Sequence, residues 1–508
     1  MLGMNRRRFL QNSALASGAA LWGQIGFAQD AAAPPLRLRL DPTKRGNRIP
    51  ADFTGLSYET AQLGDPDFFS PDNTELAGFL RRLGKQGVLR IGGNTSEYSY
   101  WTPEGAPAAS AATREDRQAN VIPEALAVGP DTGRGPAKPT KIAPQAIRNL
   151  RGFIDATGWK LIYGLNMGTE SAETAATEAE FVMRTMGDKL IAFQLCNEPD
   201  LFYRNGLRKS DYDFAQFAKE WQHFYEVIRQ KVPNASFAGP DTAFNNEWLV
   251  PFAHQFKSEV AFLSQHYYAE GPPNDPSMTI ERLLRPNPRL TAEFVGMAET
   301  KRESGLPFRL AETNSCYQGG KRGVSDTFAS ALWGADLMYQ LAAAGGVGIN
   351  FHGGGYGWYT PIAGTVAAGF TARPIYYGML LFEQAGPGYL IDVAIENPQE
   401  APLLTAYGVV NDEGGSTGTL RAVIFNKHAD RVVRLHVQTG EPGAHARALR
   451  LMAPRLDDTQ DVTLGTNPVG GSGEWEAAHE ETLPVHDGTA AIELPAGSAA
   501  LVTFSMDE

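Results

Sequence analysis

The sequence has little of what metal centres and disulfide-stapled folds require. It contains 2 cysteines among 508 residues, and no group of cysteines and histidines has the spacing of a zinc site. We therefore predict no metal and no cofactor. Cys196 and Cys316 are predicted to be small buried side chains, with a disulfide between them as the less favoured alternative.

Positive charge is also scarce. The chain has 45 lysine and arginine residues against 57 aspartate and glutamate residues, a net charge of −12, and no long basic run follows the N-terminus. Nucleic acids and anionic membranes are held mostly by basic side chains, so we predict that the protein binds neither. A small anionic ligand is still compatible with this charge, because a few local donors suffice to hold one.

Long apolar runs are missing as well. The apolar stretch at residues 14–27 is shorter than the roughly 20 residues that a membrane-spanning helix requires. It follows the sequence RRRFL at residues 6–10 and ends in small residues. This order is typical of a twin-arginine export signal, with a tethered N-terminal helix as the alternative. We predict that residues 1–28 are such a signal, and that a bacterial cell delivers the folded protein to the periplasm or beyond.

The chain is longer than one ordinary domain, and its first part alternates between strand and helix patterns. The candidate strands are residues 53–59, 88–93, 159–166, 190–196, 235–240, 260–268, 308–313 and 347–352. Helical patterns between them include residues 144–157, 174–185, 211–231 and 324–344. Eight strands with intervening helices predict an α/β fold, a (β/α)₈ TIM barrel over residues 46–370, with active-site groups at the C-terminal strand ends.

A different pattern follows from about residue 371. Helical periodicity fades, and short alternating segments appear at residues 420–425, 432–437, 491–494 and 499–504. We predict a C-terminal antiparallel β-sandwich domain over residues 371–508 that supports the barrel. Residues 29–45 include an alternating LRLRL segment and are predicted to join this sandwich. The polar, proline-rich stretch at residues 101–141 is predicted to form a wall or lid of the active site.

Two carboxylates end opposed strands of the predicted barrel. Glu198 follows the fourth strand, and Glu312 ends the seventh. Such a pair suits glycoside hydrolysis, in which one carboxyl group protonates the leaving oxygen and the other attacks the anomeric carbon from about 5–5.5 Å away in retaining enzymes. The alternative is that each glutamate is a surface or capping residue. The barrel context favours catalysis.

The segments around these glutamates resemble a known family. QLCNEPD at residues 194–200 resembles the acid/base motif of the clan of retaining glycosidases whose catalytic glutamates end strands four and seven. AETNSCYQGG at residues 311–320 resembles the nucleophile segment of glycoside hydrolase family 79, which contains heparanases and β-glucuronidases. RIGGNT at residues 90–95 and HYY at residues 266–268 are similar to that family's segments, in the same order. The resemblance covers roughly residues 50–390 and includes the barrel and sandwich architecture.

The resemblance implies roles for residues at these positions. Glu198 is expected to be the general acid/base and Glu312 the nucleophile. Asn197 is expected to hydrogen-bond the 2-hydroxyl of the sugar, an interaction that strengthens in the transition state. Tyr268 is expected to keep Glu312 ionised, and His266 to line the same wall.

Further positions are expected to bind the sugar. Glu59 is expected to accept hydrogen bonds from sugar hydroxyls, although the heparanase branch has an aspartate there. A uronate carboxylate is expected to be held by the hydroxyls of Tyr317 and Tyr359 and by the N–H groups of Gly319 and Gly320, since consecutive free amides suit an oxyanion. Lys321 and Arg322 add attraction or belong to a solvated loop. Strand five has Phe244 where a polar residue is expected, so no role is predicted there.

Together these features predict a retaining exo-β-glucuronidase that removes terminal β-D-glucuronic acid from glycans or glycoconjugates through a covalent glycosyl-enzyme intermediate. Exo action is favoured because the candidate loops lack the basic cluster that an endo-acting heparanase would use on sulfated chains. The alternatives are an endo-β-glucuronidase acting on glycosaminoglycans and a non-catalytic carbohydrate-binding barrel. The presence of both carboxylates disfavours the non-catalytic alternative.

Overall fold

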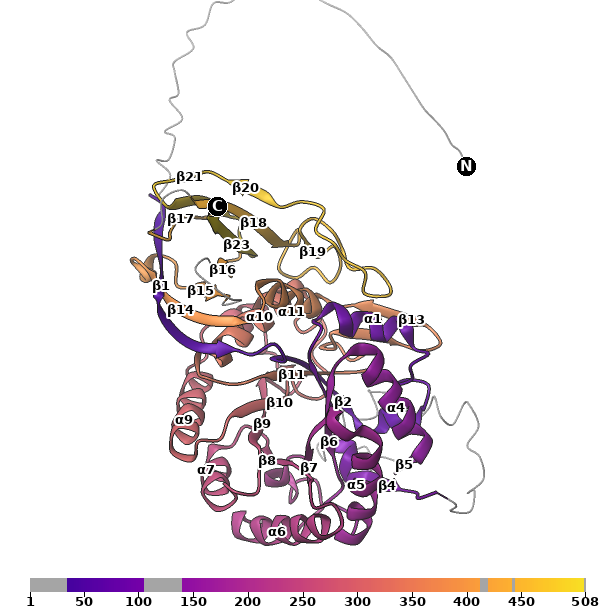
Figure 1. The fold of residues 1–508 in the computed structure, drawn as a ribbon. Coiled ribbons are helices and arrows are strands. Elements are labelled where there is room, and N and C mark those ends of the chain that lie inside the picture. The colour runs from indigo at the N-terminus through magenta and orange to yellow at the C-terminus, as the bar shows by residue number, and fades with distance from the viewer. Residues whose placement is uncertain (1–33, 105–138, 412–418, 441–443, 507–508) are drawn as a thin grey trace, which may run out of the picture. The chain divides into compact units, whose positions relative to one another are not determined.

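The computed structural model describes residues 34–104, 139–411, 419–440 and 444–506 (Figure 1). The predicted export signal at residues 1–28 and most of the predicted wall at 101–141 lie outside these ranges. Within them, no helix is both long and apolar enough to cross a membrane.

Eight parallel strands close into a barrel in the order β10-β11-β2-β3-β6-β7-β8-β9 (Figure 1). The strands are β2 (Thr54–Glu59), β3 (Val88–Gly92), β6 (Lys160–Gly164), β7 (Leu190–Gln194), β8 (Phe237–Thr242), β9 (Phe262–Glu270), β10 (Phe308–Cys316) and β11 (Ile349–Gly353). Each overlaps one of the predicted strands. The predicted α/β barrel is therefore confirmed.

Helices surround the barrel between these strands. They are α1 (Thr74–Arg82), α4 (Pro144–Thr157), α5 (Ala172–Met186), α6 (Phe214–Lys231), α7 (Asn246–Gln255), α8 (Ile280–Leu284), α9 (Pro288–Ser304), α10 (Phe328–Ala343) and α11 (Pro374–Ala385). Local sequence explains their ends. Pro144 opens α4 and Gly158 closes it in a left-handed conformation, while Asp213 and Gln216 form a capping box at the start of α6. All four predicted helical segments are confirmed.

Helix α11 corrects the prediction that helical periodicity fades after residue 371. It runs over Pro374–Ala385, and its residues from Pro374 to Phe382 are all buried. A helix that is covered on every side has no polar stripe, so its sequence shows no amphipathic period. The first strand after the barrel, β14, therefore begins only at Gly388.

The second domain is one mostly antiparallel sheet of eleven strands. Its strands are β1 (Leu36–Ile49), β14 (Gly388–Ile395), β15 (Leu404–Val410), β16 (Leu420–Asn426), β17 (Val433–Gln438), β18 (Ala444–Met452), β19 (Thr463–Leu464), β20 (Glu481–Leu483), β21 (Val485–His486), β22 (Thr489–Leu494) and β23 (Ser498–Met506). β1 pairs antiparallel with β14 and parallel with β17. Residues of β1, β17 and β22 share one core with residues of β16, β18 and β23, so the sheet folds over itself as a sandwich.

Short elements complete the fold. They are β4 (Ser99–Trp101), β5 (Thr140–Ile142), β12 (Ile362–Thr365), β13 (Gly369–Ala372) and the 3₁₀ turns at Thr60–Gly64, Asn94–Tyr98, Gly187–Lys189, Pro199–Leu201 and Pro398–Glu400. β4 and β5 pair with each other on either side of the residues that are not described.

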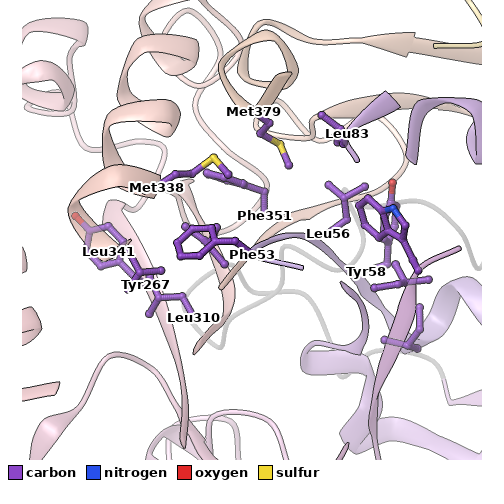
Figure 2. Packing of buried hydrophobic residues seen from close by; sticks show 14 of the residues in the cluster. Phe53, Leu56, Tyr58, Leu83, Tyr267, Leu310, Met338, Leu341, Phe351 and Met379 are labelled. Carbon is purple, nitrogen blue, oxygen red and sulfur yellow. The ribbon is translucent and has the colours of Figure 1, made fainter. Parts of the chain in front are cut away.

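The main core joins the barrel strands to helices α10 and α11. Figure 2 shows Phe53, Leu310 and Phe351 in one buried cluster with Met338 and Met379. Each apolar side chain buried in this way contributes about 1.5–3 kcal/mol relative to an exposed one. The packing fixes the strands, and thereby the positions of the side chains at their C-terminal ends.

A polar cluster connects α10 to the sheet domain. Asp336 of α10 forms an ion pair with Lys427, whose Nζ lies 2.6 Å from the Asp336 carboxylate. The same carboxylate accepts hydrogen bonds of 2.8 Å from the hydroxyls of Thr405 and Tyr407. Asp336 and Lys427 are both buried. We call these four residues the junction cluster.

Candidate active site

The two predicted catalytic carboxylates meet at the C-terminal end of the barrel. Glu198 follows β7, and Glu312 lies in β10. A carboxylate oxygen of each, together with a ring nitrogen of His266, lies within 4.8 Å of the other two. Glu198 is 9% exposed and Glu312 is 5% exposed, so both carboxylates are largely removed from water.

A left-handed turn sets the position of Glu198. Its φ is 48° and its ψ is 55°, a conformation that few residues other than glycine adopt. Its N–H donates a 2.9 Å hydrogen bond to the carbonyl of Asp241, and Pro199 opens a 3₁₀ turn directly after it. Such strain outside glycine is typical of functional positions.

Glu312 is held by donors on both oxygens. The Tyr268 hydroxyl donates to Oε1 at 2.6 Å, and Arg90 Nη1 donates to Oε2 at 2.7 Å. Burial by itself raises the pKa of Glu312, but His352, His266, Arg90 and the Tyr268 hydroxyl together hold this pKa well below its ordinary value. Glu312 is therefore an anion at neutral pH, the state that a nucleophile requires.

His266 lies between the two predicted catalytic carboxylates and a third. Its Nδ1 is 3.0 Å from Glu198 Oε1, and its Nε2 is 3.1 Å from Asp241 Oδ2. Burial lowers the pKa of His266, but the carboxylates of Asp241, Glu312 and Glu198 raise it to about 10. The ring is then a cation that donates to both neighbours.

Arg90 is a central residue for which the sequence predicted no role. It is fully buried in β3 and donates to Glu312 and Asp241, each at 2.7 Å. It also donates to Asn197 Oδ1 and Gln194 Oε1, each at 2.9 Å. The signal in the sequence was an arginine inside an otherwise apolar strand, VLRIG.

Asp241 is the second residue that the sequence left without a role. It is the next-to-last residue of β8, has a φ of 61°, and lies at a register shift between β8 and β9. Phe244, which made strand five a poor match, is buried against Tyr267 at a ring distance of 4.6 Å. The polar residue of this strand end is thus Asp241, three positions earlier.

Asn197 lies within the same network. Its Oδ1 accepts the bond from Arg90, and its Nδ2 donates to Asn94 Oδ1 at 3.1 Å. Its backbone N–H donates to the buried carboxylate of Glu97, whose pKa burial raises to about 8. Among the described residues, these contacts leave one amide hydrogen of Asn197 for a sugar hydroxyl.

Glu59 is the last residue of β2, between β11 and β3 in the barrel. Its Oε2 accepts bonds from the Thr95 N–H at 2.9 Å and the Thr95 hydroxyl at 2.6 Å. Its Oε1 is 3.5 Å from His352 Nε2, and the other nitrogen of this ring is 3.0 Å from the Ser57 hydroxyl. His352 is the next-to-last residue of β11 and is a further site residue without a predicted role.

The four residues predicted to hold a uronate carboxylate lie on two adjoining loops. The Tyr268 ring lies 6.1 Å from that of Tyr359 and 6.5 Å from that of Tyr317. Gly319 and Gly320 have φ values of 86° and 89°, and a Cβ on Gly320 would lie 2.6 Å from the Tyr359 nitrogen. Neither glycine N–H donates to another described residue. The structure therefore brings two tyrosines and two backbone donors together around Tyr268, whose hydroxyl donates to Glu312.

The basic residues of this rim have contacts of their own. Lys321 Nζ donates to the carbonyl of Asp275 at 2.7 Å. The guanidinium groups of Arg322 and Arg373 lie 5.3 and 5.6 Å from the centre of the Trp358 ring. The Trp358 N–H donates to the Gly319 carbonyl at 2.7 Å, which ties this stack to the turn that carries the two glycines.

Glu198, His266 and Glu312 have the chemistry of metal ligands, but their surroundings do not suit a cation. Arg90 donates to one of these carboxylates, and His266 is itself cationic. A metal ion here would face two positive charges at close range. Cys196 and Cys316 are buried free thiols, so the disulfide alternative is not found.

Comparison with known proteins agrees with this geometry. Residues 143–339 match the family model described as glycosyl hydrolase family 79, N-terminal domain. These residues are therefore similar to the N-terminal domain of that family. The protein is a glycoside hydrolase, which disagrees with the non-catalytic alternative.

Several curated proteins are similar to this chain over most of its length. A β-glucuronidase of Aspergillus niger is 26% identical over 74% of this chain and 70% of the relative. A β-glucuronidase of Neurospora crassa is 25% identical over 82% and 78%, and a heparanase of Mus musculus is 24% identical over 75% and 78%.

Solved structures share the fold of this chain. A 4-O-α-L-rhamnosyl-β-D-glucuronidase from Fusarium oxysporum 12S aligns with a TM-score of 0.71 over 92% of this chain and 100% of that chain, at 18% identity. An α-L-arabinofuranosidase from Thermotoga maritima aligns with a TM-score of 0.64 over 93% and 100%, at 13% identity. At these identities the likeness concerns the fold alone.

Proposed function

We propose that the protein is a retaining exo-β-glucuronidase. One observation carries the retaining mechanism: carboxylate oxygens of Glu198 and Glu312 lie within 4.8 Å of each other. Retaining glycosidases have their carboxyl groups about 5–5.5 Å apart, whereas inverting enzymes need about 6.5–9.5 Å to fit a water molecule. The short spacing favours direct attack by one carboxylate.

The two carboxylates have the environments that the two roles need. Glu312, anionic beside Arg90 and Tyr268, attacks the anomeric carbon, and the bond from that carbon to the leaving oxygen breaks. Glu198 gives its proton to the leaving oxygen. In the second step Glu198 takes a proton from water, the water oxygen bonds to the anomeric carbon, and Glu312 is released as a carboxylate.

Glucuronate is the sugar that the rim suits best. The hydroxyls of Tyr317 and Tyr359 and the N–H groups of Gly319 and Gly320 are neutral donors gathered beside Glu312. Neutral donors in a partly dry site bind a carboxylate by charge-assisted hydrogen bonds without a buried cation. The names of the fungal relatives, both β-glucuronidases, support the same substrate.

Exo action is the finer part of the proposal. The described basic residues of this rim are few, and Lys321 already donates to the Asp275 carbonyl. Sulfated chains are usually held by several basic side chains at once. The endo alternative draws its support from the relatives named heparanase.

A substrate panel tests the proposal. We expect cleavage of 4-nitrophenyl β-D-glucuronide and weak or no cleavage of the matched β-glucoside and β-galactoside, since both lack the carboxylate. Proton NMR of the first product should show the β-anomer. The α-anomer would contradict the retaining mechanism, preference for the glucoside would contradict the role of the rim, and internal cleavage of a sulfated glucuronan would contradict exo action.

Export is proposed on the sequence of residues 1–28 alone. The folded chain would pass through the twin-arginine route, which reads the arginine pair of RRRFL. Replacing Arg6 and Arg7 by lysine should leave the full-length protein in the cytoplasmic fraction of a bacterial host. Unchanged export of that variant would contradict the proposal.

A further inference from the structure

We propose that Asp241 is a positioning residue that holds the cationic partners of both catalytic carboxylates, Arg90 and His266, in place throughout the reaction. The proposal rests on the retaining mechanism given above and adds a residue to it. Asp241 touches neither the sugar nor the reacting atoms in that mechanism. It acts through the two side chains that do contact Glu312 and Glu198.

The geometry shows one oxygen serving both partners. Asp241 Oδ2 lies 2.7 Å from Arg90 Nη2 and 3.1 Å from His266 Nε2. The other amino group of the Arg90 guanidinium, Nη1, donates to Glu312 at 2.7 Å. The far side of the His266 ring contacts Glu198 at 3.0 Å. The side chain of Asp241 is therefore linked to each catalytic carboxylate through one intervening side chain, Arg90 for Glu312 and His266 for Glu198.

Asp241 is itself held rigidly. It is 1% exposed, and its Oδ1 accepts from Gln194 Nε2, while the carbonyl of that amide accepts from Arg90 Nε at 2.9 Å. Its own carbonyl receives the Glu198 N–H at 2.9 Å. The side chain and the backbone of one residue thus support the acid/base from two directions.

The charge changes of the reaction explain why a carboxylate is needed here. Before the first step Glu312 is anionic and Glu198 carries a proton. After it, Glu312 is a neutral ester and Glu198 is anionic, so one negative charge has moved from the partner of Arg90 to the partner of His266. A fixed negative charge between the two cations balances both states, and Asp241 occupies that position.

Replacing Asp241 by asparagine removes the negative charge of the side chain while keeping its size. The variant Asp241→Asn keeps the size of the side chain but brings an NH₂ group toward a cluster of donors. His266 is faced by Asp241 from β8, Glu198 from the loop after β7, Glu312 from β10 and Arg90 from β3. Loss of the Asp241 charge should lower the pKa of the His266 ring. Of the two remaining carboxylates, Glu312 is also paired with Arg90, and Glu198 carries a proton before the first step.

The decisive readout is the titration of His266 by NMR with ¹⁵N-labelled histidine, assigned by the resonance that a His266→Gln variant loses. We expect the wild-type ring to stay protonated up to about pH 10 and that of Asp241→Asn to titrate at least two pH units lower. If this variant does not fold, Asp241→Ser replaces it. A wild-type ring that titrates near pH 6.5, or an unchanged titration in a folded variant, would overturn the proposal.

Kinetics give the second readout. For Asp241→Asn we expect kcat on 4-nitrophenyl β-D-glucuronide to fall about 10²–10³-fold, with a smaller change in KM, and the alkaline limb of the pH profile to move to lower pH. Asp336→Asn, which removes a buried ion-paired carboxylate from the junction cluster, should keep the wild-type pH profile. An unchanged kcat and pH profile in Asp241→Asn would also overturn the proposal.

The two readouts separate this proposal from the function on which it rests. If the wild-type protein cleaves no β-glucuronide, the proposed function fails. The His266 titration needs no substrate and still decides whether Asp241 controls this ring.

Discussion

Two buried clusters of this molecule use the same kinds of charged group for different ends. At the barrel mouth, Arg90 lies 2.7 Å from both Asp241 and Glu312. At the junction cluster, Lys427 lies 2.6 Å from Asp336. Each cluster removes a cation and its carboxylate partner from water.

The clusters differ in their balance of positive and negative groups. In the junction cluster one cation meets one carboxylate, and Thr405 and Tyr407 supply further donors to it. At the mouth, Arg90 and His266 face three carboxylates on separate strands, two of which change charge in the proposed reaction. Removing a group should therefore reduce turnover at the mouth and stability at the junction.

The largest effect is expected from Glu312→Gln. The amide cannot attack the anomeric carbon, so kcat on 4-nitrophenyl β-D-glucuronide should fall by more than about 10⁴-fold. The variant should remain folded, because the side chain keeps its shape and Arg90 keeps its ion pair with Asp241. Retained turnover would mean that the nucleophile is another residue.

Glu198→Ala should have an effect that depends on the leaving group. An aryl glucuronide with a poor leaving group needs a proton from Glu198, so its kcat/KM should fall about 10²–10⁴-fold. With 2,4-dinitrophenyl glucuronide, whose leaving group needs no proton, the first step should persist and give a burst of product. Equal losses on both substrates would argue against Glu198 as the acid.

Tyr268→Phe should have a smaller effect that shows in the pH profile. It removes the 2.6 Å hydrogen bond to Glu312 Oε1, and a hydrogen bond to a charged group is worth about 1.5–3 kcal/mol. Because this bond helps to lower the pKa of Glu312, its loss should raise that pKa and move the acidic limb of kcat/KM to higher pH. A profile that keeps its acidic limb would contradict this role.

Lys427→Met should affect turnover least. It leaves Asp336 buried without its cation, which should lower the free energy of unfolding by about 3–5 kcal/mol in urea denaturation. The folded variant should keep the wild-type kcat and KM. A specific loss of kcat would show that the two clusters are not separate in function.

The sequence predicted the parts of this molecule that depend on local patterns. The barrel strands are apolar runs with polar ends, and the segments around Glu198 and Glu312 carry family motifs. The donor roles expected of Tyr317 and Gly320 rest on the same resemblance and on the consecutive free amides of this segment, and they stay predictions. These features can be read from residues that are neighbours in the chain.

The missed features depend on residues that are far apart in the chain. Arg90 and Asp241 meet only because closure of the barrel brings together side chains of β3 and β8, which are not neighbouring strands. Helix α11 is covered on all sides, so its sequence shows no periodic face. The contact between Arg90 and Asp241 depends on closure of the barrel, and the lack of an apolar period in α11 depends on its burial. Neither can be read from residues that are neighbours in the chain.

The covalent intermediate is the most direct test of the central claim. The protein would be incubated with a 2-deoxy-2-fluoro-β-glucuronyl fluoride, which slows the second step, and then digested and analysed by mass spectrometry. We predict one added fluoroglucuronyl group on the peptide that contains Glu312, bound to that side chain. Substrate turnover without any labelled peptide, or a label on a different residue, would contradict the account.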